Sequence, residues 1–435
     1  MTRRLISIPF FLLRTTTAGA AVVTGLLQTF VFAHVLSPER FSIFILVAAI
    51  GYSLWLIDFG VVKILFVRLR ARFLAGERSG AAAGHATAVI LFYLALVVTG
   101  ALICLFVTAR HASMLHAAEF ALFFLFVAFN LVWFALRNIS IAVDQYLLFE
   151  ALEAVRRAGY FLGLAAVFFG LPLIVMLVAV NALWAVVLTV CVRRLIASGA
   201  LVPRAGGTIE DLHAFFAANR AELVRSGAYA ASEIYIYNFP YLIVPMLFGL
   251  GAPPIILDTT FKVFRGGANI FGAVCDILVP RQTSALAERD GPTLIRATAL
   301  AAAMCAIPAA AACAILLFGA GPLFSFLLGR AATMPAAATP ILMVLLLANL
   351  TQMVTHSVLV HNGSFREVAR LGVGVSVAMT GVAAYAVIAH LDIVAFLAAY
   401  AAVYACGALA AVVLMIRGPI QLAHGIAPTP KVAPQ

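Results

Sequence analysis

Long apolar runs recur along this chain from Phe10 to Met415, separated by short polar segments. A helix of about 20 apolar residues crosses the ~30 Å hydrocarbon core of a bilayer. The pattern therefore predicts an all-α polytopic membrane protein with about twelve transmembrane helices. We place the predicted spans at residues 12–35, 40–66, 82–108, 113–136, 154–170, 172–195, 223–249, 254–280, 294–318, 337–361, 368–390 and 392–416.

The two halves of the chain repeat one another at a nearly constant offset. RTTTAGAA begins at Arg14, and RSGAYAA begins at Arg225, 211 residues later. LAGERSG (74–80) is echoed by LAERDG (286–291), and EALEAVRRAG (150–159) by FREVARLG (365–372). Such repetition indicates an internal duplication, which predicts two pseudo-symmetric six-helix lobes. The expected units are an N-terminal lobe (1–204), a linker (205–222), a C-terminal lobe (223–418) and a disordered cytoplasmic tail (419–435).

The linker between the halves has the pattern of an amphipathic helix. Its start, Thr208–Asp211, resembles a capping box, and apolar residues follow at helical spacing on an otherwise polar segment. A helix with one apolar stripe is typical of a segment that lies flat on a membrane. We therefore expect this interfacial helix to lie at the inner membrane surface and to join the two lobes.

Composition and charge add an orientation to this picture. Apolar residues make up 65% of the chain and charged residues 10%, so a soluble domain of ordinary size is excluded. Segments on one predicted side hold 22 of the 28 Lys and Arg, whereas the other side holds Arg40, Arg110 and Arg330. By the positive-inside rule, both termini are expected in the cytoplasm, with the protein in a bacterial inner membrane. The net charge of +11 is then a topology signal, and no nucleic-acid partner is expected.

Sequence motifs for metal binding and catalysis are absent. The six cysteines lie within or beside apolar spans without CxxC pairing, so we expect no metal and no cofactor. The chain has no HExxH, Walker or GxSxG pattern, and the predicted outer loops are short. We therefore do not expect an enzyme.

The span over 254–280 carries the clearest polar face. A charge that faces lipid is costly, so such residues usually face a protein interior or a wet cavity. Asp258, Lys262, Arg265, Asn269 and Asp276 recur at helical spacing. Two interpretations stay open: a stripe that faces substrate, or an ion pair between Asp258 and Lys262 with Arg265 bonded to a neighbouring helix.

The span over 223–249 has a second polar face. Arg225, Tyr229, Glu233, Tyr237 and Tyr241 follow one another at four-residue intervals. Such a face can bind sugars or ions. The alternative is an aromatic packing seam with a buried salt bridge from Glu233 to Lys262 or Arg265.

Other polar residues within the spans give weaker signals. Asp58 and Lys63 lie five residues apart near the inner end of the span over 40–66 and so do not share a face. Threonines in helices often bond to their own backbone, and polar residues at helix interfaces often bond between helices. The remaining stripes are Arg14, Thr17, Thr24 and Gln28 in the first span, and Asn349, Gln352 and His356 in the tenth.

Two segments carry a family resemblance. VLSPERFSIF (35–44), followed by LIDFG (56–60), resembles the N-terminal signature of polysaccharide flippases, which belong to the multidrug/oligosaccharidyl-lipid/polysaccharide exporter superfamily. VPRQTSALAERDG (279–291) is similar to a second pattern of that family. Ser42 stands where the family usually has Gly.

The resemblance implies that the two six-helix lobes surround a central cavity. It also implies a flippase that moves a polyprenyl-pyrophosphate-linked oligosaccharide from the cytoplasmic to the periplasmic leaflet by alternating access. Such a protein serves O-antigen or exopolysaccharide synthesis, with membrane lipids, a polysaccharide polymerase and other assembly proteins as partners. The alternatives are a drug/cation antiporter of the same superfamily, a membrane glycosyltransferase or ligase, and a non-transporting scaffold. We expect substrate binding by Arg14, Arg225, Lys262, Arg265, Asn269, Tyr229, Tyr237 and Gln28, and coupling or gating by Glu233, Asp258 and Asp58.

Overall fold

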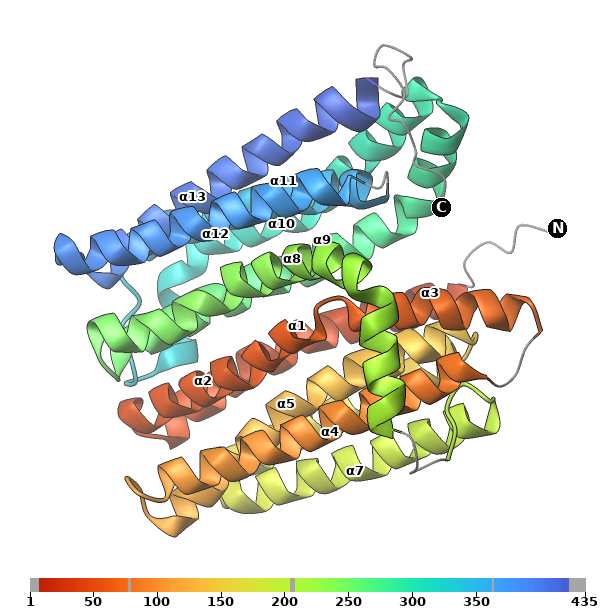
Figure 1. Ribbon diagram of the computed structural model, residues 1–435. Coiled ribbons are helices and arrows are strands. Elements are labelled where there is room, and N and C mark those ends of the chain that lie inside the picture. Colours follow the sequence, from red (N-terminus) through yellow and green to blue (C-terminus); the bar gives the residue numbers. More distant parts are fainter. Residues whose placement is uncertain (1–7, 77–79, 204–207, 362–363, 422–435) are drawn as a thin grey trace.

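The computed structural model describes residues 8–76, 80–203, 208–361 and 364–421, and within them the chain is almost wholly helical (Figure 1). The helices are α1 (Ile8–Val35), α2 (Pro38–Ser53), the 3₁₀ helix η1 (Leu54–Asp58), α3 (Val61–Leu74), α4 (Ala81–Thr108), α5 (Met114–Ala142), α6 (Tyr146–Phe168), α7 (Leu173–Ala197), α8 (Thr208–Phe248), α9 (Ala252–Glu288), α10 (Gly291–Leu328), α11 (Ala338–His361), α12 (Phe365–Ile388), α13 (Ile393–Met415) and the π-helical turn η2 (Ile416–Ile420).

The helices form two lobes that lie side by side (Figure 1). In the N-terminal lobe α5 packs against α2, α3, α4 and α7, and α6 packs against α1 and α7; in the C-terminal lobe α11 packs against α9, α10 and α13, and α12 against α8 and α13. Counting α2 with η1 as one passage, twelve helical passages are described, and α3 is an additional short helix. The prediction of an all-α polytopic protein with about twelve helices in two lobes is confirmed.

The polar content of the helices is uneven. Eight helices in the described residues are long enough and apolar enough to cross a membrane. Of the other long helices, α1 has a shorter apolar stretch, Gly19–Val35, and α6, α8 and α9 each carry several charged residues. Helices with charged residues therefore occur in both lobes.

The predicted span over 40–66 is not one helix. The chain breaks between η1 and α3, where Phe59 (φ 40°) and Gly60 (φ 79°) adopt left-handed backbone conformations. The Asp58 carboxylate accepts hydrogen bonds from the N–H groups of Gly60 and Val62, both at 3.1 Å, and so satisfies N–H groups at the start of α3 that have no partner within the helix. The prediction of a continuous helix was wrong because it considered only hydrophobicity.

Helix α8 has an elbow: its first part crosses the bundle, and its second part runs alongside the other helices (Figure 1). The first part contains most of the predicted linker, whose position at a membrane surface stays a prediction. Within the second part, Pro240 has no N–H and leaves the Ile236 carbonyl without its usual helical donor. The Tyr400 hydroxyl of α13 donates to that carbonyl at 2.9 Å, so α8 is joined to α13 within the C-terminal lobe.

Most basic side chains gather at one end of the bundle. Figure 1 shows that α1 begins and α13 ends at this end, which we call the basic end. It is also the end where α3 and α7 finish, with their arginines Arg68, Arg70, Arg72, Arg193 and Arg194. Arg156 and Arg157 lie apart from this group, well inside α6.

The lobes contact one another toward the end opposite the basic end. The Ser42 hydroxyl of α2 accepts a hydrogen bond from the Gly251 N–H at 2.8 Å and lies 2.9 Å from the Gly251 carbonyl oxygen, to which it can donate. The rings of Phe30 and Phe326 stack with their centroids 4.8 Å apart. Toward the basic end of α9, by contrast, Asn269 and Asp276 are exposed. The conformation is therefore closed at the end opposite the basic end.

Candidate substrate site between the lobes

Lys262 lies at the contact between α9 and α1. Its ammonium group pairs with the Asp258 carboxylate at 2.7 Å and donates to the Thr29 hydroxyl at 2.8 Å. Of the two interpretations given for Asp258 and Lys262, the geometry favours the ion pair within the helix. The lysine charge is thus largely neutralised, and its hydrogen bond to Thr29 links the lobes.

Arg265 turns away from this pair and toward α8. Its guanidinium donates to the Tyr237 carbonyl at 2.5 Å and to the Asn238 side-chain oxygen at 3.3 Å. It also lies 4.9 Å from the ring centroid of Tyr241 and 6.0 Å from that of Tyr52, within the range of cation–π attraction. Among the described residues, no carboxylate forms an ion pair with Arg265. Neutral dipoles and aromatic faces surround its charge, which leaves it able to attract an anion.

Asn238 connects the Arg265 site to the N-terminal lobe. Its amide nitrogen donates to the Ala49 carbonyl at 3.2 Å and to the Ser53 hydroxyl at 3.3 Å, both on α2. The same side chain therefore accepts from Arg265 and donates across the lobe contact. A movement of α2 away from α8 would change the surroundings of the guanidinium.

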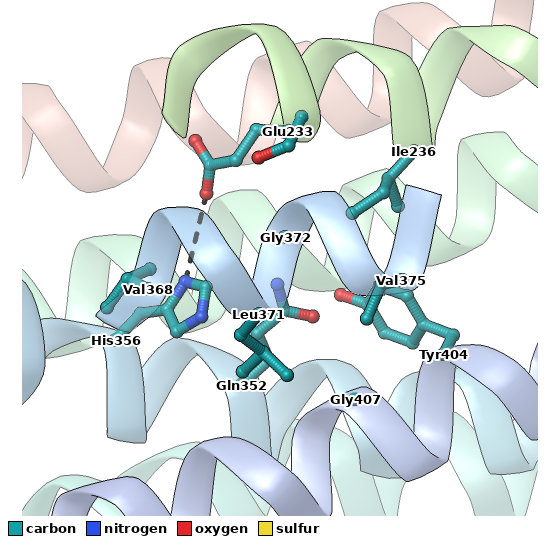
Figure 2. A pocket seen from close by; sticks show the side chains of 11 residues that line it. Glu233, Ile236, Gln352, His356, Val368, Leu371, Gly372, Val375, Tyr404 and Gly407 are labelled. Carbon is teal, nitrogen blue, oxygen red and sulfur yellow. Dashed lines mark ion pairs between the residues drawn. The ribbon is translucent and has the colours of Figure 1, made fainter. Parts of the chain in front are cut away.

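Glu233 lies in a different place, inside the C-terminal lobe. Figure 2 shows its carboxylate facing His356 of α11, with an oxygen–nitrogen distance of 3.8 Å; the contact is ionic when His356 is protonated. Gln352 and Tyr404 also line the small pocket beside them. Its volume of about 20 Å³ is enough for one water molecule. Glu233 thus faces His356, so the interpretation in which it bonds Lys262 or Arg265 is not the arrangement seen in the described residues. Lys63 of α3 also interacts electrostatically with Glu233.

A charge cluster in the N-terminal lobe was missed by the sequence reasoning. The buried Glu153 carboxylate accepts from Trp133 at 2.7 Å, from Arg156 at 2.7 and 2.8 Å, and pairs with Arg157 at 2.5 Å. One carboxylate faces two guanidinium groups, so the cluster has a surplus positive charge. An acid followed by arginines at i+3 and i+4 is a recognisable helix pattern, and it was the available signal.

The remaining predicted residues are dispersed. Asp58 is buried, caps α3 and accepts from the Tyr93 hydroxyl at 2.7 Å, a geometry that favours a structural role. Gln28 is half-buried on α1, and Asn269 is exposed on α9. The side chains of three predicted residues lie outside the described part: Arg14, Arg225 and Tyr229.

The predicted residues that the structure brings together are Asp258, Lys262, Arg265 and Tyr237. Sequence reasoning missed Tyr52 and Asn238 beside Arg265. In the described residues, no group of three or more His, Cys, Asp or Glu side chains is placed to hold a metal ion.

Comparison with known proteins identifies the fold of this chain. No protein-family profile and no curated protein sequence matches the chain. An inward-facing multidrug resistance MATE family transporter of the MOP superfamily matches with a TM-score of 0.64 at 13% identity, covering 95% of this chain and 96% of that one. An outward-facing MATE family transporter gives 0.59 at 15% identity, with coverages of 96% and 97%.

A MOP superfamily transporter from Pyrococcus furiosus, described as having a binding pocket of reversed polarity that suggests a different function, gives a TM-score of 0.57 at 13% identity, with coverages of 97% and 96%. At these identities the likeness is one of fold. This chain has the fold of the MATE transporters of the MOP superfamily.

Proposed function

We propose that this protein is a flippase that moves a lipid-linked oligosaccharide across a bacterial inner membrane by alternating access, with both termini in the cytoplasm. The main observation that supports this proposal is the environment of Arg265. A guanidinium at the contact between the lobes, held by a carbonyl and an amide rather than by a carboxylate, suits an anionic headgroup. Arginine can bind two phosphate oxygens at once.

The second support is the surplus charge in the N-terminal lobe. Arg156 and Arg157 both pair with the single carboxylate of Glu153. A pyrophosphate between the lobes would then be attracted by Arg157 from one side and Arg265 from the other. Since the two arginines belong to different lobes, the headgroup would contact both moving bodies.

The membrane potential can drive such transport. Moving one negative charge outward from a negative interior releases ~2.3 kcal/mol per 100 mV. A pyrophosphate headgroup with about two charges would release roughly twice that amount. Ion coupling is an addition to this drive, and Glu233 with His356 is the pair we propose for it, because a carboxylate and an imidazole face one another beside a space for one water.

The fold also suits a drug/cation antiporter, the function that the names of its structural neighbours suggest. A cation site beside Arg265 would require a carboxylate free to bind the cation, whereas Asp258 is buried against Lys262 and Arg265 has no acidic partner in the described residues. The Pyrococcus furiosus transporter, with its reversed pocket polarity, supports the view that charge within this fold discriminates between substrates. The charges near Arg265 therefore favour the anionic substrate.

The test is the leaflet distribution of labelled lipid-linked oligosaccharide in a strain that lacks this protein, complemented with variants. Arg265→Gln should leave the protein in the membrane and trap the intermediate in the inner leaflet. Arg296→Gln, which removes an exposed arginine from the second turn of α10, is the matched control and should restore export. Normal export with Arg265→Gln would refute the assignment, and an unchanged distribution in the deletion strain would refute the flippase.

A further inference from the structure

An apolar groove lies at the elbow of α8, apart from the site between the lobes. This elbow groove has a volume of about 550 Å³. The lining residues come from α8, with one from the break between η1 and α3: His213, Phe216, Ala217, Arg220, Leu223, Val224, Ala228 and Phe59. Because both lobes contribute to its lining, the shape of the groove depends on how the lobes are arranged.

The groove exposes large apolar side chains and carries a cation. Val224 is 67% exposed and Phe59 49% exposed, so both present apolar surface along the groove. Gly227 allows Phe59 to lie against α8, because a Cβ at that position would be 2.7 Å from the Phe59 ring. Arg220 is exposed and lines the same groove. An apolar channel beside a guanidinium matches a molecule with a hydrocarbon chain and an anionic head.

Contacts with the N-terminal lobe hold the first part of α8 in place. Arg68 donates a hydrogen bond to Asn219, and the Arg68 guanidinium lies 5.8 Å from the ring centroid of Phe215. The ring of His85 lies edge-on to Phe215 at 5.6 Å. These contacts fix the first part of α8 against the N-terminal lobe. The elbow groove lies where this part, which contains the predicted interfacial helix, meets the second part of α8.

We propose that the elbow groove binds an anionic membrane phospholipid, with an acyl chain along Phe59 and Val224 and the phosphate at Arg220. Basic residues at a membrane surface attract anionic lipids. The substrate of the proposed function is not the occupant we infer, because Arg265 contacts Tyr237, nine residues and about 14 Å along α8 from Ala228. A lipid that bridges Phe59 and α8 would stabilise the present arrangement of the lobes.

The experiment is native mass spectrometry of the full-length protein, titrated with phosphatidylglycerol or with phosphatidylcholine of the same acyl chains. Wild type should retain one phosphatidylglycerol in preference to phosphatidylcholine. Arg220→Gln should weaken phosphatidylglycerol binding about fivefold without affecting phosphatidylcholine. Ala228→Trp, which fills the groove, should abolish binding of the retained lipid. Arg366→Gln and Ala310→Trp alter exposed positions on α12 and α10 and should bind as wild type does.

Equal binding of the two lipids by wild type, or unchanged phosphatidylglycerol binding by Arg220→Gln, would overturn the proposal. Arg220 is exposed, so its substitution keeps the test valid even where Ala228→Trp fails to fold. A polyprenyl phosphate that displaces phosphatidylglycerol at equal concentration, and that the same two variants weaken, would assign the groove to the substrate carrier instead. Since the readout is binding without transport, its failure is distinguishable from failure of the flippase assignment.

Discussion

Ser42→Ala should shift the protein from its present closed conformation toward one that opens at the end opposite the basic end. The Ser42 side chain is fully buried, and it both accepts from the Gly251 N–H at 2.8 Å and lies 2.9 Å from the Gly251 carbonyl. It also lies 2.7 Å from the Pro38 carbonyl of its own helix, so its single proton is shared between two acceptors. The firm contribution across the lobes is the bond from Gly251.

The magnitude follows from the loss of that bond. Leaving a buried N–H without an acceptor costs about 1–3 kcal/mol, and an opened conformation that exposes Gly251 to water avoids this cost. A value of about 2 kcal/mol shifts the equilibrium between the conformations roughly 30-fold. The alanine methyl group keeps the packing of α2 nearly unchanged, so the effect should be specific to the hydrogen bond.

Electron paramagnetic resonance distances would measure the shift. Spin labels at His111 and His390, which are exposed residues after α4 and α12, report on the separation of the lobes at this end. Ser42→Ala should add or enlarge a long-distance population, whereas Thr189→Ala, which removes a hydroxyl that bonds only its own helix at 2.7 Å, should not. Identical distance distributions for all three proteins would show that the Ser42 bond does not hold the lobes closed.

Three further substitutions follow from the geometry. Glu233→Gln should leave the protein folded but remove any dependence of transport on a pH gradient, measured in inverted vesicles. Tyr93→Phe removes the donor 2.7 Å from the Asp58 carboxylate and should lower the stability by about 1.5–3 kcal/mol, measured as thermal unfolding in detergent. Gly227→Val places a side chain against the Phe59 ring, 2.7 Å from the position of its Cβ, and should destabilise the protein by about 1–3 kcal/mol.

Matched controls separate these effects from general damage. Glu367→Gln removes an exposed carboxylate and should retain the pH dependence. Tyr385 is 58% exposed, so Tyr385→Phe should unfold at the wild-type temperature. A Cβ at Gly374 meets nothing within 4 Å, and Gly374→Val should be tolerated. Equal losses in a test variant and its control would contradict the corresponding contact.

Hydrophobic periodicity located the helices because burial and membrane insertion act on long segments, which average over individual residues. It could not locate the break at Phe59 and Gly60, because that break depends on a single carboxylate bonding two backbone N–H groups. Asp58 was noticed as a polar residue within a span, but its role depends on the direction of the following chain. Whether a side chain caps a helix in this way depends on the local backbone geometry, which a hydropathy pattern does not describe.

The sequence predicted which residues of the candidate site share a helix face, but it predicted few of the contacts that these residues make with other helices. Spacing put Asp258, Lys262 and Arg265 on one face, and the ion pair at four residues was among the interpretations considered. The partner of Glu233 comes from α11, more than 100 residues away, and helix spacing contains no information about that distance. Glu153 precedes Arg157 by one helical turn, so spacing could have indicated this pair, but positive charge was used only to assign the topology.

The hydrogen bond from Tyr400 to the carbonyl freed by Pro240 has a mechanical consequence. A proline within a long helix is commonly regarded as a hinge, since it removes one hydrogen bond. Here a tyrosine from α13 restores that bond from outside, so α8 is stiffened at the point where it would otherwise flex. During a transport cycle, movement between the lobes should then occur at the contacts between α2 and α8 and between α1 and α9. The C-terminal lobe should rotate as a rigid body.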